Sequence, residues 1–115
     1  MGGHALIPYV AGVLDGEGCI RYKSTPTVEI TNKHQGMLVA LQKRWGGAVR
    51  VKGEGIYVWC LYGQRALNFL SQMSKYSIVK YPQIVALFAA SYTACPETRN
   101  KHIAELKRLK SVYTD

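Results

Sequence analysis

The nine residues Val10-Ala11-Gly12-Val13-Leu14-Asp15-Gly16-Glu17-Gly18 decide the fold of this chain of 115 amino acids. The stretch from Pro8 to Asp15 is almost entirely apolar, which predicts a short buried helix with proline in its first turn. Gly12 and Gly16 lie one helical turn apart, so one face of that helix carries no side-chain bulk. A second copy of the helix could approach this face until the two backbones nearly touch.

The remaining chain alternates between strand-like and helix-like spacing of its apolar residues. Alternation at every second residue predicts strands over residues 19–25, 27–31, 49–52 and 56–61. Helical spacing predicts helices over 37–45, 67–73, 82–88 and 97–109. This order predicts an α+β fold of the αββαββα type, with a four-stranded antiparallel sheet and extra C-terminal helices. The length fits a single domain over residues 1–115.

The alternation also sorts the strand residues between the two faces of the predicted sheet. The apolar face under the helices is expected to contain Val28, Ile30, Val49, Val51 and Val58. The other face would carry cations, hydrogen-bonding groups and aromatic rings, namely Arg21, Lys23, Thr25, Thr27, Glu29, Thr31, Arg50, Lys52, Tyr57 and Trp59. This mixture fits a DNA groove, although an ordinary solvated sheet face also carries Lys, Arg and Thr. The tryptophan favours a binding surface, because an exposed tryptophan in mid-sheet is costly unless something covers it.

The charge of the chain favours a polyanionic partner. Fifteen Lys and Arg against seven Asp and Glu give a net charge of +8. Between Gly18 and Pro96 the acids are only Glu29 and Glu54, so the positive field is broad. Nucleic acid is therefore the first partner to consider. Ribosomal and membrane-surface proteins are also basic, so charge alone does not choose the function.

The cysteine and hydropathy patterns indicate the kind of cellular compartment in which the protein is expected. Cys19, Cys60 and Cys95 are an odd number spaced far apart, which fits neither a disulfide framework nor a zinc knuckle. No run approaches the roughly 18 apolar residues that a membrane span needs, and the first residues lack the pattern of a signal peptide. We therefore expect reduced cysteines, no membrane partner, and a soluble intracellular protein of the cytoplasm or an organelle.

Residues 10–18 resemble LAGLIDADG, the nine-residue motif of the homing endonuclease family of that name. Ala11, Gly12, Asp15 and Gly18 are identical to the motif, and Gly16-Glu17 stand where it has Ala-Asp. The other three positions hold conservative apolar replacements. The element order and the basic hairpins agree with the family over most of residues 8–90. The resemblance implies the LAGLIDADG endonuclease fold. It also implies an intron-encoded enzyme that hydrolyses both strands of a long, near-palindromic DNA target.

The resemblance also implies a homodimer and a metal site. The family builds its site from two motif helices side by side, and a single motif in this chain implies C2 symmetry. The expected interface residues are Ala11, Gly12, Asp15 and Gly16, with Asp15 as a helix-end or interface hydrogen bonder. Glu17 takes the position of the acidic metal ligand, one methylene longer than aspartate, and the Gly16 carbonyl that of a further ligand. The implied cofactor is Mg²⁺, for which Mn²⁺ is expected to substitute.

Two further residues match positions that arrange water around the family's site. The implied reaction is in-line attack of water on the phosphodiester, with the metal stabilising the attacking and leaving oxygens. In the family, polar residues at the end of the second strand help to arrange this water. Asn32, which ends the second predicted strand, matches that position. Lys80 is the candidate for the lysine before the fourth helix, with Lys75 as the alternative. Lys80 is equally well interpreted as a solvated lysine at a helix start. The three histidines show no ligand spacing.

Several alternatives stay open at this stage. A maturase that binds intron RNA and an inactive DNA-binding regulator share the scaffold, although the retained carboxylate of Glu17 argues against the regulator. A basic RNA-binding domain with a chance motif is the third. The cations of residues 101–110 could contact phosphates or only solvent. Strands of about 10 residues would span roughly 33 Å, so each subunit is expected to cover about 10 base pairs.

Overall fold

The structure, a computed structural model, describes the backbone of residues 3–112 and the side chains of residues 6–110. Its elements in chain order are α1 (Gly3–Glu17), β1 (Gly18–Tyr22), β2 (Pro26–Asn32), α2 (Gln35–Trp45), β3 (Ala48–Gly53), β4 (Ile56–Tyr62), α3 (Gln64–Met73), α4 (Tyr81–Tyr92) and α5 (Pro96–Val112). The predicted αββαββα order with further C-terminal helices is confirmed. The first helix is longer than predicted, with Pro8 inside it rather than in its first turn.

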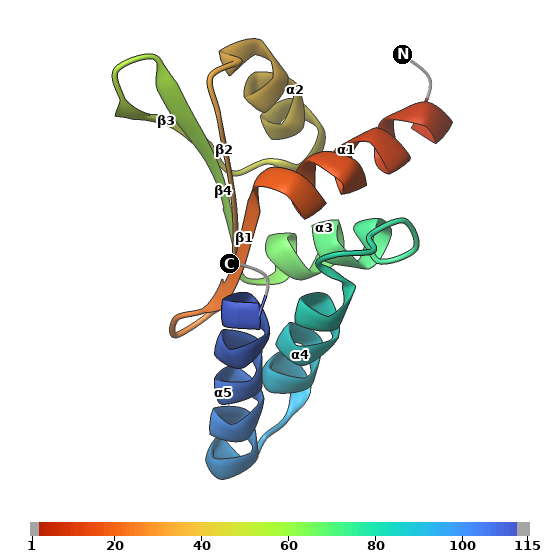
Figure 1. Cartoon of the computed structure of the whole chain (residues 1–115), viewed down its shortest axis with the longest axis vertical. Coiled ribbons are helices and arrows are strands. Elements are labelled where there is room, and N and C mark those ends of the chain that lie inside the picture. Colours follow the sequence, from red (N-terminus) through yellow and green to blue (C-terminus); the bar gives the residue numbers. More distant parts are fainter. Residues whose placement is uncertain (1–2, 113–115) are drawn as a thin grey trace.

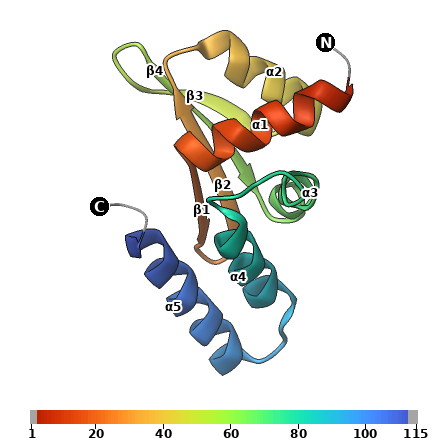
Figure 2. The same ribbon diagram turned by 45° about the vertical axis from the view of Figure 1, so that its right-hand side comes forward.

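The four strands form one antiparallel sheet in the order β1-β2-β4-β3. Helices α1, α2 and α3 lie against one face of the sheet, and among the described residues no helix covers the opposite face (Figure 1). We call that opposite face the open face. Helices α4 and α5 form an antiparallel pair near the β1 edge and extend away from the other helices (Figures 1 and 2).

The core lies between the sheet and the helices, and it contains Trp59. In the register of β2 and β4, Trp59 is opposite Ile30, and partners in a ladder point to the same face. Trp59 is 0 % exposed and packs edge-on against Phe69, with ring centroids 5.1 Å apart. Its indole nitrogen donates to the Gly46 carbonyl at 2.9 Å. The prediction of an exposed Trp59 is therefore wrong, and Tyr57, which is also packed against the core, shares the error.

The sequence prediction assigned the residues of β4 to the wrong faces of the sheet, and this error has a physical cause. Both alternating sets of residues in this strand are apolar and buried, so alternation does not reveal which set faces the helices. The helix side takes the largest side chain, because an aromatic ring fills the most core volume. The error also reaches Val58, which was expected under the helices but is paired with Thr31 and Arg50 on the open face. Val51 lies on the helix side, opposite Tyr57, but it is not in the core as expected. It is 72 % exposed, beside an irregularity in the β3–β4 register between Val51 and Gly53.

Helix α1 fixes where the motif residues lie. Val10, Ala11 and Leu14 are buried in the core at 0–1 % exposure, whereas Gly12 and Gly16 are exposed on the other side of the helix. No helix within residues 3–112 combines the length and apolar content that a membrane span requires.

Candidate metal centre and nucleic-acid interface

The glycine face of α1 has no partner within the described chain. A Cβ atom added at Gly12 or Gly16 would meet no other atom within 4 Å. In Figure 2, α1 crosses the front of the molecule with no other element over it. Tyr9, half of which is exposed, and Val13 join the two glycines in lining a shallow hollow of about 450 Å³. The sequence prediction of a bare helix face at these two glycines is confirmed.

Two residues predicted at the interface of this helix have a different environment. Ala11 is 0 % exposed and belongs to the core of its own chain, so it offers no surface to a second copy. The side of an almost wholly apolar helix that faces the core is not visible in its sequence. Asp15 is half-buried, and its carboxylate is used within the chain. Ala11 is therefore a correction to the predicted interface set, whereas Asp15 takes the helix-end alternative of its prediction.

Asp15 ties the end of α1 to the segment that precedes α4. Its carboxylate accepts hydrogen bonds from the Ile78 amide at 2.7 Å, the Lys80 amide at 3.1 Å and the Val79 amide at 3.2 Å. The Ser77 hydroxyl donates to the same carboxylate. Burial raises the pKa of Asp15, but the hydrogen bonds from Ser77 and the three amides outweigh it and hold the pKa below its usual value. The helix end is thus fixed by an ionised carboxylate.

Glu17 and Asn32 meet where α1 and β2 end. The Asn32 side-chain amide donates to Oε2 of Glu17, and its own carbonyl oxygen accepts the His34 amide at 2.8 Å. Glu17 is exposed, and together with Asn32 it lines two adjoining hollows of about 340 and 450 Å³. Gly16 lies in the last turn of α1, where backbone carbonyls have no partner within the helix. The structure therefore brings Asn32 into contact with Glu17, at the end of the helix that contains Gly16.

The two candidate lysines differ in their relation to the motif. Lys80 is half-buried at the start of α4, and its amide is bound by Asp15, two residues before Glu17. Lys75 is exposed in the turn after α3. The backbone of Lys80 is thus fixed to the motif helix. Lys80 therefore remains a better candidate than Lys75 for the lysine that the resemblance implies.

The described part of one chain offers few acidic or other ionisable side-chain ligands for a metal ion at the end of α1. Among the described residues, no three His, Cys, Asp or Glu side chains lie close enough to share a metal ion. Glu17 is the one acidic residue lining the two hollows at the end of α1. A cation bound there would take one carboxylate from this chain, and its other ligands would be backbone or amide oxygens, water, or groups of another molecule.

A polar network crosses the open face of the sheet from edge to edge. Arg21 of β1 forms an ion pair with Glu29 of β2, and the Cys60 thiol of β4 donates to the same carboxylate at 3.3 Å. Arg50 of β3 donates to the Cys60 sulfur and to the Tyr62 hydroxyl, each at 3.4 Å. The network thus contains one residue or more from every strand. The network fixes Arg21 and Arg50 on a face of the sheet that no described helix covers.

The remaining predicted members of the open face divide by exposure. Lys23 and Lys52 are exposed, and Thr25 and Thr31 are half-buried. Thr27 is only 6 % exposed, and its hydroxyl donates to the Thr25 carbonyl at 3.2 Å, which removes it from the predicted contact set.

Sequence reasoning missed two residues of this face. The alternation that places Trp59 on the helix side puts Cys60 and Tyr62 on the open face, so the size of Trp59 was the signal that would have found them.

The fold is that of the LAGLIDADG homing endonucleases, as a comparison with solved structures shows. Neither a protein-family model nor a curated protein sequence matches the chain.

Three structures illustrate the likeness. The archaeal intron-encoded homing endonuclease I-Vdi141I, complexed with DNA, superposes with a TM-score of 0.75 at 18% identity, over 94% of this chain and 86% of that one. The homing endonuclease I-CvuI with its target gives 0.73 at 17% identity, over 96% and 83%. The LAGLIDADG meganuclease I-AabMI, bound to uncleaved DNA, gives 0.69 at 18% identity, over 88% of this chain but 43% of its own.

Proposed function

We propose that this chain is a LAGLIDADG homing endonuclease, a site-specific enzyme that hydrolyses both strands of duplex DNA as a homodimer with a divalent metal ion. The observation that carries the proposal is the exposed carboxylate of Glu17, which is hydrogen-bonded to Asn32 beside a helix face without a partner. The fold supports it, because the similar structures are the homing endonuclease I-Vdi141I and the LAGLIDADG meganuclease I-AabMI, each bound to DNA.

The bare face of α1 supports the homodimer. Two copies that pack Gly12 and Gly16 against each other bury a surface that is otherwise exposed. This packing brings the two Glu17 carboxylates together at the ends of the paired helices. Two adjacent carboxylates repel each other unless a cation lies between them. A shared site also explains why one chain supplies a single carboxylate there.

The residues at the end of α1 fit a hard divalent cation. Mg²⁺ prefers oxygen ligands and keeps several waters, so one carboxylate oxygen per subunit suits it better than a closed protein cage. Asn32 engages one oxygen of Glu17, which leaves the other for the cation, and the Gly16 carbonyl is a second oxygen donor. When bound, the ion would stabilise negative charge on the phosphate and the leaving oxygen. Mn²⁺ takes the same ligand types and is expected to replace it.

The side chains around Glu17 orient the reaction. The Asn32 amide fixes the Glu17 carboxylate, and the His34 backbone amide in turn fixes the orientation of the Asn32 side chain. Lys80 would place a positive charge near the scissile phosphate and help to hold the attacking water, because Asp15 binds its backbone close to the motif. These residues bind and orient, and no side chain is required as a nucleophile.

The open face of the sheet is the proposed DNA-binding surface. Arg21, Lys23, Arg50 and Lys52 supply positive charge, and the first and third of these are held by the Glu29–Cys60 network. Phosphate contacts would position the dimer, and side chains held in fixed orientations would read base edges in the major groove. The strands contain five to seven residues, not about 10, so the longest spans roughly 23 Å. One sheet therefore covers about seven base pairs, and longer targets need contacts beyond it.

The test is metal-dependent cleavage of a randomised duplex library by three proteins. Wild-type protein and the control Glu97→Gln, an exposed acid at the start of α5, should cut with Mg²⁺ or Mn²⁺ and not with chelator. Glu17→Gln should still bind duplex DNA but cut none, because it keeps the size of the side chain and removes the charge. Duplex binding without cleavage by wild-type protein would favour the inactive regulator. Binding of RNA alone would favour an RNA-binding protein.

A further inference from the structure

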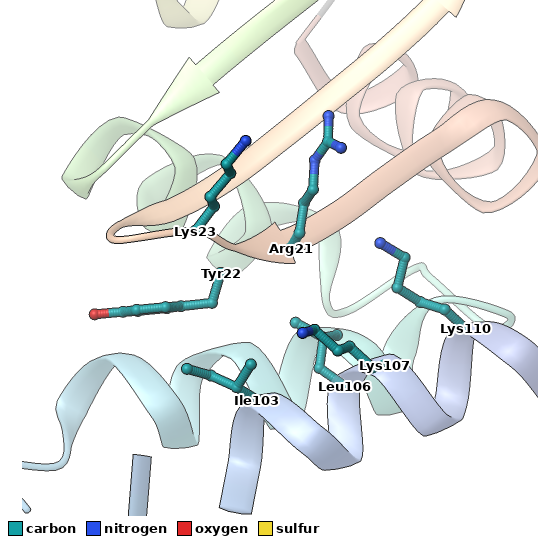
Figure 3. Close-up of a pocket in the computed structure, with 7 residues that line it drawn as sticks. All are labelled: Arg21, Tyr22, Lys23, Ile103, Leu106, Lys107 and Lys110. Carbon is teal, nitrogen blue, oxygen red and sulfur yellow. The ribbon is translucent and has the colours of Figure 1, made fainter. Parts of the chain in front are cut away.

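A cationic hollow lies between strand β1 and helix α5, away from the residues around Glu17. Figure 3 shows the side chains that line it, and its volume is about 310 Å³. Arg21 and Lys23 line it from the strand side, and Lys107 and Lys110 line it from the helix. We call it the β1–α5 pocket. None of its lining residues is acidic, and four of the seven are cationic.

The pocket is continuous with the open face of the sheet. β1 is an edge strand, and α5 packs beside it. The Lys110 ammonium donates to the Cys19 sulfur of β1 at 3.4 Å, which holds the helix to the strand. Arg21 belongs both to this pocket and to the network on the open face, through its ion pair with Glu29. A chain of phosphates that leaves the sheet at β1 would therefore enter the pocket next.

The floor of the pocket strengthens its attraction for an anion. Tyr22, Ile103 and Leu106 form an apolar surface between the cations, and Leu106 is 1 % exposed. Lysine stems can lie along such an apolar surface while their ammonium groups stay in water. A charge beside low-dielectric walls interacts more strongly than one on an open surface. Lys23 and Lys107 are exposed and form no ion pair with any residue between 6 and 110.

We infer that the β1–α5 pocket binds a backbone phosphate of duplex DNA that flanks the segment contacted by the sheet. The inference rests on the proposed DNA-binding function and assigns a role to α5. Two observations favour DNA over a free anion: the pocket continues the open face, and the sheet by itself spans only about seven base pairs. A phosphate contact carries no sequence information. The pocket should thus add affinity without changing base preference.

The experiment compares the salt dependence of duplex binding by two double variants. Lys107→Gln/Lys110→Gln removes two charges from the pocket. The control Lys43→Gln/Lys101→Gln removes two from exposed positions on α2 and α5 outside it. Kd is measured by fluorescence anisotropy on one long duplex from 50 to 300 mM KCl. The slope of log K against log salt should become shallower by about 0.9 for each phosphate that the pocket variant no longer neutralises. The control should stay close to wild type.

A second measurement protects the result against an altered fold. The single variant Lys107→Gln changes an exposed side chain with no ion pair among the described residues, so it should leave folding intact. On duplexes with one neutral methylphosphonate linkage at successive positions, wild-type binding should weaken at a linkage outside the sheet footprint, and Lys107→Gln should remove that sensitivity. Equal slopes for pocket and control variants, or equal interference patterns, would overturn the inference while leaving the proposed function standing. Absence of any duplex binding by wild-type protein would overturn both.

Discussion

Gly12→Leu separates the fold of one chain from the pairing of two. In the isolated chain a Cβ atom at Gly12 meets nothing within 4 Å, so a larger side chain begins in open space. Glycine inside a helix costs about 0.5–1 kcal/mol relative to good helix formers, so the variant monomer should be more stable by roughly that amount. The same side chain would stand between two closely packed α1 helices in the dimer.

The size of the dimer effect follows from symmetry. Each dimer would receive two leucines, and overpacking costs about 1–3 kcal/mol for each inserted side chain. The expected loss of roughly 2–6 kcal/mol corresponds to a dimer Kd raised about 30-fold to 10⁴-fold. Ala104→Leu, at an exposed position of α5, is the matched addition of apolar surface elsewhere.

Sedimentation velocity over a dilution series measures the dimer Kd, and urea unfolding at low concentration measures monomer stability. We expect Gly12→Leu to be a stable monomer and Ala104→Leu to be a wild-type dimer. A folded Gly12→Leu protein with an unchanged dimer Kd would refute the assignment of the interface to the glycine face of α1.

Two other residues give predictions with measurable outcomes. Asp15→Asn should lower the free energy of unfolding by about 1–3 kcal/mol, because an amide accepts the loop hydrogen bonds with one oxygen instead of two and without charge. The folded-state pKa of Asp15 lies below its ordinary value of 3.8, so its contribution is complete above that value and is lost as pH falls through the lower one. The stability gap between wild type and Asp15→Asn, followed by urea unfolding, should therefore narrow below about pH 4; a constant gap down to pH 2 would contradict this. Cys60→Ala should relax base preference at the positions read by Arg50, by up to ~1–3 kcal/mol per base contact, whereas Cys60→Ser should preserve it through its hydroxyl. Selection of DNA targets with each variant measures this base preference. If Cys60→Ala and Cys60→Ser gave the same base preferences, the thiol would not position Arg50.

The sequence predicted best those features that depend on local spacing. The order of helices and strands followed from apolar periodicity, and the bare face of α1 followed from two glycines one turn apart. The contact of Glu17 with Asn32 was anticipated only in the sense that both matched a family pattern. The first two features depend on spacing along the chain, whereas the third depended on the family resemblance.

Features that depend on packing between elements could not be derived in this way. In β4, apolar residues occupy both faces, and only the volume available under the helices decides that Trp59 points inward. Ala11 and Gly12 are adjacent small residues, yet one lies in the core and the other on the surface. The contacts of Asp15 with residues 77–80 join segments more than 60 positions apart, and no local pattern marks them.

The most direct test of the central claim is to sequence both cut ends of every duplex that the wild-type protein cleaves in a randomised library with Mg²⁺. We predict paired cuts, one in each strand, inside targets whose two halves are related by two-fold symmetry. The centre of symmetry should lie between the cuts, where the two Glu17 carboxylates of the homodimer would meet. Each half-site should show base preference over about seven base pairs, the span of one sheet, with flanking positions that affect affinity but not sequence. Cuts confined to one strand, or selected targets without two-fold symmetry, would contradict a shared site built from two copies of this chain.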